Sequence, residues 1–390
     1  MNTRRYRWLI FDAFVLLFCI SIAGASFLFN DFSAQNSFAQ QAEATEQQLR
    51  LGSKPNPSEA NNDYVRPEWF ITEPHASQVE DWSPAIKKAT LHAAKMGGNT
   101  VKFSCGKTYK ITEPLDLDMN RFQNEFVGSV RWQGCATDYE YASMPPTIEY
   151  TGDGTKAAIS ARSAYGWRVE GMKIQYTNPA FKGRLIDLSH SVVAEGGNGG
   201  DSAYISITDS TLTGTPNAME ADALVYLGGG IISRIETTHF FYARQGIRGM
   251  EQAGGNHYAY VYTIAKNSFN MVDRAIVNPS SNWVIANNTF EPNRFHQLVA
   301  VENDCGTNCA LASGVTFSNN YLGDGVAQDH PIVRFVNADG VTIQGNWWYS
   351  DTEVSRAAIT LDRCEGVVIS GNSARPLNHL SKQRAALRLA

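Results

Sequence analysis

The sequence lacks an excess of charge of either sign. Its 390 residues include 33 Lys and Arg against 38 Asp and Glu, which gives a formal net charge of −5. Proteins that bind nucleic acid usually carry a strong basic excess, so this balance argues against a nucleic-acid partner. Charged residues are only 18% of the chain, too few for a coiled coil, and 43% apolar residues are too many for a disordered chain.

The ligand patterns typical of metal and phosphate sites are also lacking. Asp187 and other scattered aspartates could supply calcium ligands, but no loop shows a recognisable calcium-binding spacing. The run Gly228-Gly229-Gly230 does not stand in the strand–loop–helix context of a phosphate-binding loop. We therefore expect neither a bound metal nor another cofactor.

The N-terminus has the form of an export signal. Arg4, Arg5 and Arg7 precede a mostly apolar run over residues 8–29, which contains small residues suited to cleavage. The run is also long enough to cross a bilayer, for which roughly 20 residues suffice. Residues 1–30 are therefore predicted to be either a cleaved signal peptide or a retained membrane anchor. Both alternatives place the rest of the chain in the periplasm or outside the cell.

Five of the six cysteines lie beyond this segment, and their positions suggest disulfides. Cys305 and Cys309 could close a small loop, and Cys105 and Cys135 could form a second bridge, leaving Cys364 unpaired. Disulfides persist in oxidising compartments, which agrees with export. Free thiols are the alternative, whereas a metal site would need a second pair of Cys or His ligands.

Two segments precede the main body of the chain. Residues 31–65 are rich in Gln, Ser, Asn and Ala without an apolar period, which predicts a disordered linker. An ordered domain is expected over residues 66–390. Its first element is a predicted helix at about residues 83–96, with Ser83 as N-cap, Pro84 in the first turn and Gly97-Gly98 at its end. Short strands are predicted at 100–103, 109–111 and 115–117.

A repeated pattern fills the rest of the chain. An apolar residue, two small or polar residues and an Asn recur around Asn267, Asn288, Asn320, Asn346 and Asn372, and Met172, Ser210 and Thr238 extend the series upstream. Spacings of 21, 32, 26 and 26 residues, with strands and no helix between them, predict a β-solenoid. There, Asn would tolerate a left-handed backbone at a turn, and its amide would bond to the Asn of the next coil. The alternative, a β-sandwich with hairpins, would give Asn-Gly dipeptides instead of Gly-Asn and Asn-Asn.

Residues 81–117 resemble the opening segment of the pectate-lyase-like superfamily, with its helix, Gly-Gly turn, strand and Gly-x-Tyr step. The Ile-x-Gly-Asn repeats resemble the coils of that superfamily. The resemblance covers about residues 65–390 and implies an all-β fold: a single right-handed parallel β-helix whose first coil is capped by the N-terminal helix. It is not specific for a reaction, because the superfamily includes lyases, glycoside hydrolases, epimerases, phage tailspikes and non-enzymatic surface proteins.

The resemblance also implies a polysaccharide partner, bound along the outer face of one parallel sheet. No two aspartates are adjacent in the chain, so the hydrolases that use paired Asp residues are poorly matched. The leading hypothesis is β-elimination on an acidic exopolysaccharide, which needs a base and cations that neutralise the sugar carboxylate. The candidate catalytic residues are Arg248, His257 and Lys266. The candidate substrate-binding residues are Arg244, Tyr258, Arg274, Arg294, His296 and Arg334.

Strand register predicts that Arg248 and Arg334 point outward, because Ile247 and Val333 take inward positions. Two such arginines on nearby coils would form a strip that binds carboxylates. The alternative is that these side chains are solvated or paired with acidic neighbours.

Other functions stay open beside the lyase. They are a glycoside hydrolase, a non-catalytic polysaccharide-binding or assembly protein of the cell envelope, and an adhesin-like fibre. We expect a monomer that meets a membrane only through the possible N-terminal anchor.

Overall fold

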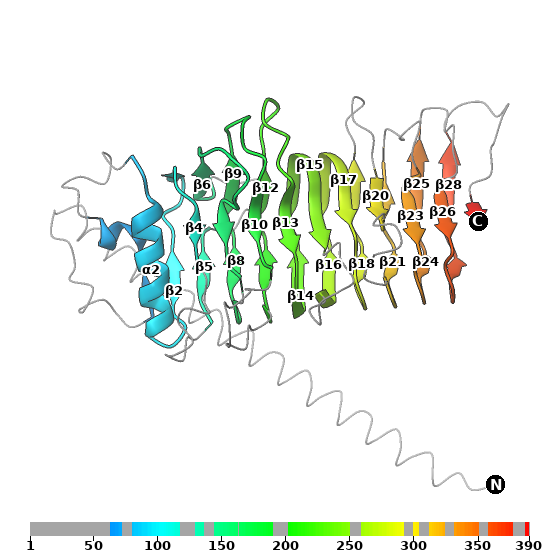
Figure 1. The fold of residues 1–390 in the computed structure, drawn as a ribbon, viewed down its shortest axis with the longest axis horizontal. Helices are drawn as coiled ribbons and strands as arrows, with labels where there is room; N and C mark the ends of the chain where they lie inside the picture. The colour runs from blue at the N-terminus through cyan, green and yellow to red at the C-terminus, as the bar shows by residue number, and fades with distance from the viewer. Residues whose placement is uncertain are drawn as a thin grey trace, which may run out of the picture. The chain divides into compact units, whose positions relative to one another are not determined.

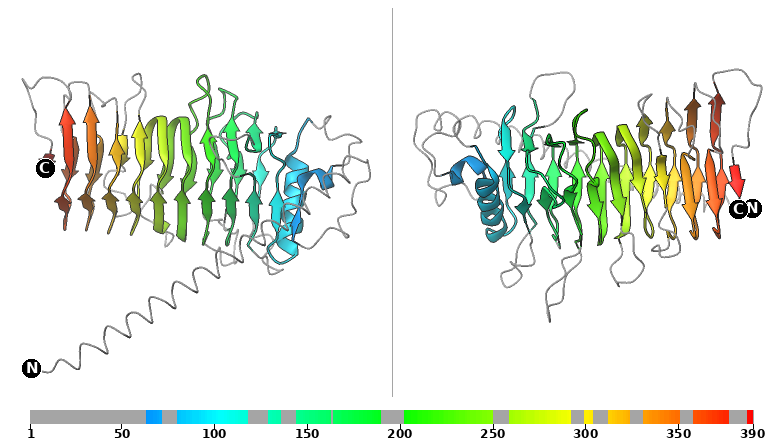
Figure 2. Two further views of the ribbon diagram at one scale, coloured as in Figure 1. Left: turned by 180° about the vertical axis from the view of Figure 1, so that it is seen from behind. Right: turned by 45° about the horizontal axis from the view of Figure 1, so that its top comes forward.

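The computed structural model describes residues 63–71, 80–117, 129–135, 144–162, 164–189, 202–249, 259–291, 299–303, 312–323, 331–350, 358–376 and 387–389, all within the compact unit Asn61–Ala390. Most of them lie in strands that coil around one axis, and strands of successive coils pair in parallel (Figure 1, Figure 2). The chain folds as a right-handed parallel β-helix, as predicted.

Each coil contributes one strand to an 11-stranded parallel sheet, here called sheet A. In spatial order its strands are β1 (Tyr64–Val65), β2 (Thr100–Lys102), β5 (Arg131–Gln133), β8 (Arg168–Glu170), β11 (Ser206–Thr208), β14 (Gly230–Glu236), β16 (Ala259–Ala265), β18 (Val284–Ala286), β21 (Thr316–Ser318), β24 (Thr342–Gln344) and β27 (Val368–Ser370). Chain order and spatial order agree, so each coil lies directly on the one before it.

The other strands form an 18-stranded sheet, which we divide into two rows. Row B1 follows sheet A in each coil and contains β3 (Thr108–Ile111), β6 (Thr147–Tyr150), β9 (Lys173–Tyr176), β12 (Thr211–Thr213), β19 (Thr289–Glu291), β22 (Tyr321–Leu322), β25 (Trp347–Ser350) and β28 (Ser373–Pro376). Row B2 completes the coil with β4 (Leu115–Asp116), β7 (Ile159–Ser160), β10 (Arg184–Asp187), β13 (Ala223–Leu227), β20 (Val299–Glu302), β23 (Val333–Val336), β26 (Ile359–Asp362) and β29 (Leu387–Leu389). Two long strands, β15 (His239–Gly249) and β17 (Ser268–Val277), pass through both rows.

The core consists of apolar side chains that stack from coil to coil. In row B2 the residues in register are Ile186, Val225, Ile247, Ile276 and Val301, all fully buried. In row B1 the rings of Phe240, Phe269 and Phe290 stack with centroid distances of 4.6 and 5.0 Å. Side chains alternate across a strand, so each inward residue fixes an outward neighbour.

The predicted asparagine ladder is present at the corner between sheet A and row B1. In successive coils each Nδ2 donates to the Oδ1 of the next ladder residue at 2.9–3.1 Å, along Asn267, Asn288, Asn320, Asn346 and Asn372. The same Oδ1 accepts the backbone N–H of the preceding ladder residue at 2.9 Å. Each Nδ2 also reaches a backbone carbonyl one coil earlier. One side chain therefore ties three consecutive coils together.

The left-handed backbone predicted for the ladder residue belongs instead to the residue before it. Positive φ angles occur at Asp209, Thr237, Lys266, Asn287, Asn319, Gly345 and Gly371, each directly before a member of the series. One left-handed residue turns the chain at the corner, and Gly or Asn adopts this backbone at least cost. The Gly-Asn and Asn-Asn dipeptides thus combine a turn residue with a ladder residue.

The predicted capping helix is α2 (Ser83–Lys95), which lies against the first coil. Its Ser83 is the first helical residue, not the predicted N-cap, because Asp81 Oδ1 accepts both the backbone N–H and the hydroxyl of Ser83, at 3.0 and 2.6 Å. The apolar spacing predicts one face made of Ile86, Ala89, Ala93 and Met96. The first three are buried, whereas Met96 is exposed because the helix ends at Lys95. Sheet A begins at β1, two residues before the predicted domain start, because Tyr64 and Val65 pair with β2.

A half-buried carboxylate joins the short helix η1 (Pro67–Phe70) to the coil of β2 and β3. Glu68 Oε1 accepts hydrogen bonds from Ser104 Oγ, Lys107 Nζ and Tyr109 Oη at 3.1, 3.0 and 2.6 Å. Burial, and then the neighbouring Glu68, raise the pKa of the Tyr109 phenol. The phenol therefore stays protonated and donates to Glu68.

Cys105 and Cys135 form a disulfide with their Cα atoms 5.9 Å apart, and Cys364 is a free thiol. The bridge joins the coils that contain β2 and β5. Cys305 and Cys309, predicted to pair, lie outside the described residues, as do residues 1–30 with their predicted signal or anchor.

Replacing Cys135 by Ser is expected to lower the free energy of unfolding by about 2–4 kcal/mol, because the lost bridge no longer restricts the unfolded chain. Denaturant unfolding with and without reductant measures the effect. The comparison is made in a Cys305→Ser, Cys309→Ser background, in which the second predicted bridge cannot form. There, reductant should lower the stability of the protein that keeps Cys135 to the level of Cys135→Ser and leave that variant unchanged. Cys364→Ser is the matched control, with an unfolding curve close to the wild type. A wild-type curve insensitive to reductant would contradict the expectation.

Candidate functional site

Row B2 has a line of side chains that point away from the core, of which Ser160, Val277 and Glu302 are nevertheless buried. In register from coil to coil they are Asp116, Ser160, Asp187, Tyr226, Arg248, Val277, Glu302, Arg334 and Thr360. The inward neighbours Ile247 and Val333 are fully buried, so Arg248 and Arg334 face outward as predicted. Three coil steps separate these two arginines, about 14 Å at the spacing of parallel strands. They are therefore not neighbours.

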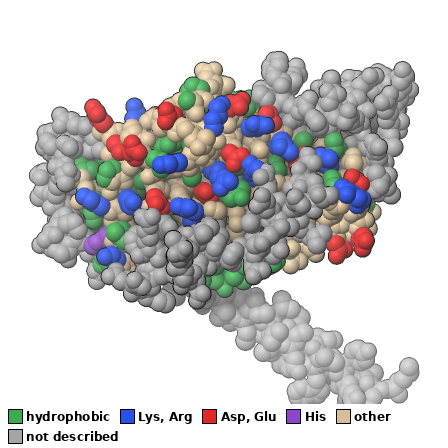
Figure 3. Space-filling view, in the orientation of Figure 1, with side chains coloured by type: hydrophobic (Ala, Val, Ile, Leu, Met, Phe, Trp, Pro, Cys, Tyr) green, Lys and Arg blue, Asp and Glu red, His purple; other side chains and the backbone are tan. Residues whose placement is uncertain are grey.

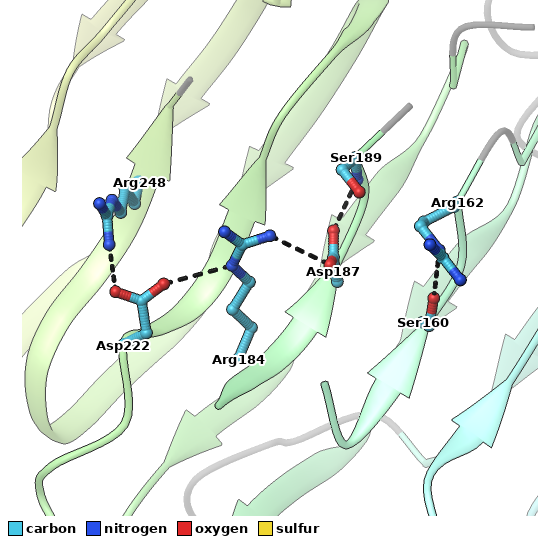
Figure 4. Close-up of polar contacts among 7 residues, drawn as sticks. All are labelled: Ser160, Arg162, Arg184, Asp187, Ser189, Asp222 and Arg248. Atoms are coloured by element: carbon cyan, nitrogen blue, oxygen red, sulfur yellow. Dashed lines mark hydrogen bonds and ion pairs between the residues drawn. The ribbon is translucent and has the colours of Figure 1, made fainter. Parts of the chain in front are cut away.

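Five side chains gather on this face and form what we call the arginine–aspartate cluster: Arg184, Asp187, Asp222, Tyr226 and Arg248. Figure 4 shows the two arginines and the two aspartates. Arg184 donates from Nη1 to Asp187 Oδ2 at 3.1 Å and from Nε to Asp222 Oδ2 at 3.2 Å. Asp222 also accepts a hydrogen bond from Arg248 through its other oxygen. The Arg184 Cζ lies 3.3 Å from the centroid of the Tyr226 ring. Opposite charges thus alternate around one tyrosine.

The local sequence explains how the cluster forms. Arg184 and Asp187 are the two ends of β10, and register places Tyr226 of β13 beside Asp187 and Arg248 of β15 beside Tyr226. A Cβ atom on Gly228 would lie 2.4 Å from the Tyr226 ring. Gly228 therefore leaves the space in which this ring lies.

The cluster is half-buried and held in place. Side-chain exposures are 13% for Asp187 and 14% for Arg248. Burial disfavours the Arg184 cation, but Asp187, Tyr226 and Asp222 outweigh burial and raise the pKa of Arg184. The Ser189 backbone N–H donates to Asp187 Oδ1 at 2.8 Å. The charges are therefore fixed in position before any ligand arrives.

The other predicted site residues that the structure describes lie outside the cluster. Arg274 of β17 pairs with Glu302 of the next coil. Arg244 is exposed in β15, and Lys266 is exposed at the corner between sheet A and row B1. Basic and acidic side chains are intermixed on the surface in Figure 3, which agrees with the alternative of paired charges and not with a purely cationic strip.

His257, Tyr258, Arg294 and His296 were also candidates, and all four lie outside the described residues. Of the predicted catalytic and binding residues that the structure describes, Arg248 alone belongs to the cluster.

Sequence reasoning missed Arg184, Asp222 and Tyr226. A signal for Tyr226 exists in the repeats, because an inward Ile or Val precedes an outward polar residue at Ile186-Asp187, Val225-Tyr226 and Ile247-Arg248. Aligning these pairs would have placed Tyr226 between Asp187 and Arg248. Asp222 precedes its strand, so no strand pattern indicated it.

The chemistry available in the cluster is that of its own side chains. Two guanidinium groups can neutralise a carboxylate, and a phenol or a carboxyl group can transfer protons. Among the described residues, no group of three or more His, Cys, Asp and Glu is placed to hold a metal ion. Within those same ranges, no helix is both long and apolar enough to cross a membrane.

No family model matches the sequence, and no curated protein matches it. Solved structures match the fold. The tailspike of Acinetobacter baumannii phage AM24 aligns with a TM-score of 0.50 at 14% identity, over 81% of this chain and 56% of the tailspike chain. The surface adhesin PfbA of Streptococcus pneumoniae aligns with a TM-score of 0.50 at 12% identity, over 80% of this chain and 90% of its own.

A third match is the tailspike of Escherichia coli bacteriophage HK620, solved in complex with a pentasaccharide. It aligns with a TM-score of 0.50 at 12% identity, over 84% of this chain and 65% of its own. This chain thus spans little more than half of the AM24 tailspike and about two thirds of the HK620 tailspike. The matches agree with the fold that the sequence resemblance implied, a right-handed parallel β-helix.

Proposed function

We propose that this chain binds an acidic polysaccharide on the outer face of row B2 and cleaves it by β-elimination at the arginine–aspartate cluster. One observation carries the proposal: Arg184 and Arg248 hold a single carboxylate, that of Asp222, between them beside the outward Tyr226. The two aspartates balance the two arginine charges, so the carboxylate of an acidic sugar would bind through N–H groups of Arg184 that Asp187 and Asp222 leave unused. The fold shared with a tailspike solved with a pentasaccharide supports a saccharide ligand.

In the proposed reaction, Tyr226 as phenolate removes the proton on the carbon beside the sugar carboxylate. The electron pair of the broken C–H bond forms a carbon–carbon double bond, and the bond to the glycosidic oxygen breaks. The leaving oxygen takes the proton back from the phenol. Arg184 and Arg248 neutralise the carboxylate while negative charge develops on it. The two aspartates accept hydrogen bonds from two of the five N–H groups of Arg184. In the proposed complex, the remaining N–H groups of Arg184 donate to the sugar carboxylate.

A second function, glycoside hydrolysis, is favoured by the two carboxylates of the cluster. Asp187 and Asp222 are far apart in the sequence, yet both bind the Arg184 guanidinium. A pair of carboxyl groups is what a glycoside hydrolase needs, one as acid and one as base or nucleophile. Hydrolysis would release new reducing ends without a double bond, whereas a protein that only binds polysaccharide would give neither product.

We also propose that the protein works outside the cytoplasm as a monomer. The Cys105–Cys135 bridge supports an oxidising compartment. Fractionation of cells that express the full chain checks the location, and light scattering checks the mass.

The test of cleavage is the ultraviolet absorbance of unsaturated sugars released from alginate, polygalacturonate and hyaluronan. We expect product with at least one of them, and about a 100-fold slower rate for Arg184→Lys, because an ammonium cannot bond both aspartates and the substrate as a guanidinium does. Arg168→Lys, an exposed arginine of sheet A, is the matched control and should keep the wild-type rate. Folded wild-type protein that yields no unsaturated product from a broad panel rejects β-elimination.

A further inference from the structure

The corner between row B2 and sheet A has its own series of left-handed residues. They lie at equivalent positions, each two residues before sheet A residues that pair in register from β8 to β27. Ile232 and Val261 lie inside the longer strands β14 and β16. Their φ angles lie between 50° and 71°, at Gly166, Tyr204, Ile232, Val261, Asn282, Gly314, Gly340 and Gly366. Most of these corners hold Gly or Asn, the residues that adopt a left-handed backbone at the lowest energetic cost. Three consecutive coils depart from that rule.

The departures are costly for the fold. Tyr204, Ile232 and Val261 have bulky side chains, and a β-branched residue with positive φ is a genuine outlier. Thr237, another β-branched residue with positive φ, gains a hydrogen bond from its Oγ1 to Asp209 Oδ1 at 2.6 Å. The hydrocarbon side chains of Ile232 and Val261 can form no such bond.

The same side chains are exposed to solvent. Exposed fractions are 46% for Tyr204, 50% for Ile232 and 46% for Val261. Tyr165, directly before Gly166, is 62% exposed, and its ring centroid lies 5.2 Å from that of Tyr204 in an edge-on arrangement. We call Tyr165, Tyr204, Ile232 and Val261 the corner ridge. A side chain that is both strained and exposed helps neither stability nor solubility, which points to binding.

The corner ridge belongs to the coils that carry the arginine–aspartate cluster. Along the chain, β10 with Asp187 leads to Tyr204, and β13 with Tyr226 leads to Ile232. Strand β15 with Arg248 leads to Val261 in the same way. The corner ridge therefore follows the edge of the face on which the cluster lies, with about one side chain per coil.

We propose that the corner ridge binds an extended polysaccharide chain that runs along the stack of coils. Successive sugar rings would pack their C–H-rich faces on it. This inference rests on the proposed function, because it assigns a second contact of the same polysaccharide. The coil repeat of about 4.8 Å is close to the length of one pyranose unit, so each ring can meet one side chain.

The geometry is less suited to other partners. A folded protein partner needs about 800 Å² on each side, more than one line of four side chains offers. A peptide strand needs a free sheet edge, but β11 and β14 already pair on both sides. An anionic membrane needs several unpaired cations beside the apolar side chains. On the adjacent sheet A, Arg168 is exposed, but Arg131 and Arg234 pair with Glu170 and Glu236.

The test is the double variant Ile232→Asn with Val261→Asn, which installs the residue found at the equivalent Asn282. The melting temperature should stay or rise by about 1–3 °C, because strain is relieved. The dissociation constant for polysaccharide should rise about tenfold, because apolar contact is lost. Retention in gels cast with alginate, polygalacturonate or hyaluronan measures binding. Val368→Asn, at a 52% exposed residue of β27, is the matched control and should keep wild-type retention.

The outcomes separate this inference from the proposed cleavage. Weaker retention of the double variant, when the wild type gives no unsaturated product, supports the corner ridge and rejects β-elimination. Unchanged retention of the double variant, or no retention of the wild type in any gel, overturns the corner-ridge proposal whether or not cleavage occurs. A wild-type dimer by light scattering that the double variant loses, with retention unchanged, assigns the corner ridge to self-association and overturns it as well.

Discussion

Replacing Tyr226 by Phe is expected to slow the release of unsaturated sugars by about 10³-fold or more, with little change in polysaccharide retention. The size follows from the loss of a general base or acid, worth about 10²–10⁴-fold. Phenylalanine keeps the ring that lies under Arg184 and over Gly228, so the variant removes one oxygen and leaves the packing intact. Initial rates by ultraviolet absorbance on the most reactive polysaccharide measure the effect.

The control for this variant is Tyr321→Phe. Tyr321 lies in row B1, away from row B2, where its ring contacts that of Trp347 at a centroid distance of 5.1 Å and a tilt of 40°. Its loss of the phenol oxygen should leave the rate unchanged. A Tyr226→Phe protein that works within tenfold of the wild type rejects Tyr226 as the proton-transferring residue.

Replacing Asn320 by Ala is expected to lower the free energy of unfolding by about 3–5 kcal/mol. Its Oδ1 accepts both the backbone N–H and the Nδ2 of Asn288, and its Nδ2 donates to the Ile285 carbonyl and to Asn346 Oδ1. The variant leaves several of these buried groups without the partner they have in the wild type. Denaturant unfolding followed by circular dichroism measures the change.

Asn319 offers a matched control directly beside Asn320. It is exposed at the corner with φ of 54°, and the equivalent residue one coil later is Gly345. Asn319→Gly should therefore change the free energy of unfolding by less than about 1 kcal/mol. Equal losses in the two variants would show that the ladder contributes nothing specific.

Much of the fold could be predicted because the coils repeat. A periodic Asn indicated the ladder, and alternation around Ile247 and Val333 indicated which arginines face outward. The opening helix had its apolar spacing and its Gly-Gly end. The turn residue was assigned one position too late, since a dipeptide such as Asn319-Asn320 does not show which residue bends and which bonds.

The cluster could not be predicted in the same way, because it depends on contacts between coils of unequal length. Asp222 directly precedes β13 and bonds to both Arg184 and Arg248. It lies 38 residues after Arg184 and 26 before Arg248, and the repeat period does not set these unequal separations. Most of the candidate site residues, by contrast, come from residues 244–296, which were selected because this stretch is rich in basic side chains. Composition does not show that Arg274 already has Glu302 as its partner.

The asparagine ladder has a direction, with consequences for the order in which the protein is made. From Asn267 onward, each rung donates its backbone N–H and its amide to an oxygen that belongs to the following coil. During synthesis from the N-terminus, a ladder asparagine can make these two hydrogen bonds only after the following coil has been synthesised. A chain whose synthesis stops within the ladder therefore ends in an asparagine that lacks both bonds. The coils therefore assemble in order from the N-terminus, and the last coil formed completes its ladder hydrogen bonds only when the next coil packs against it.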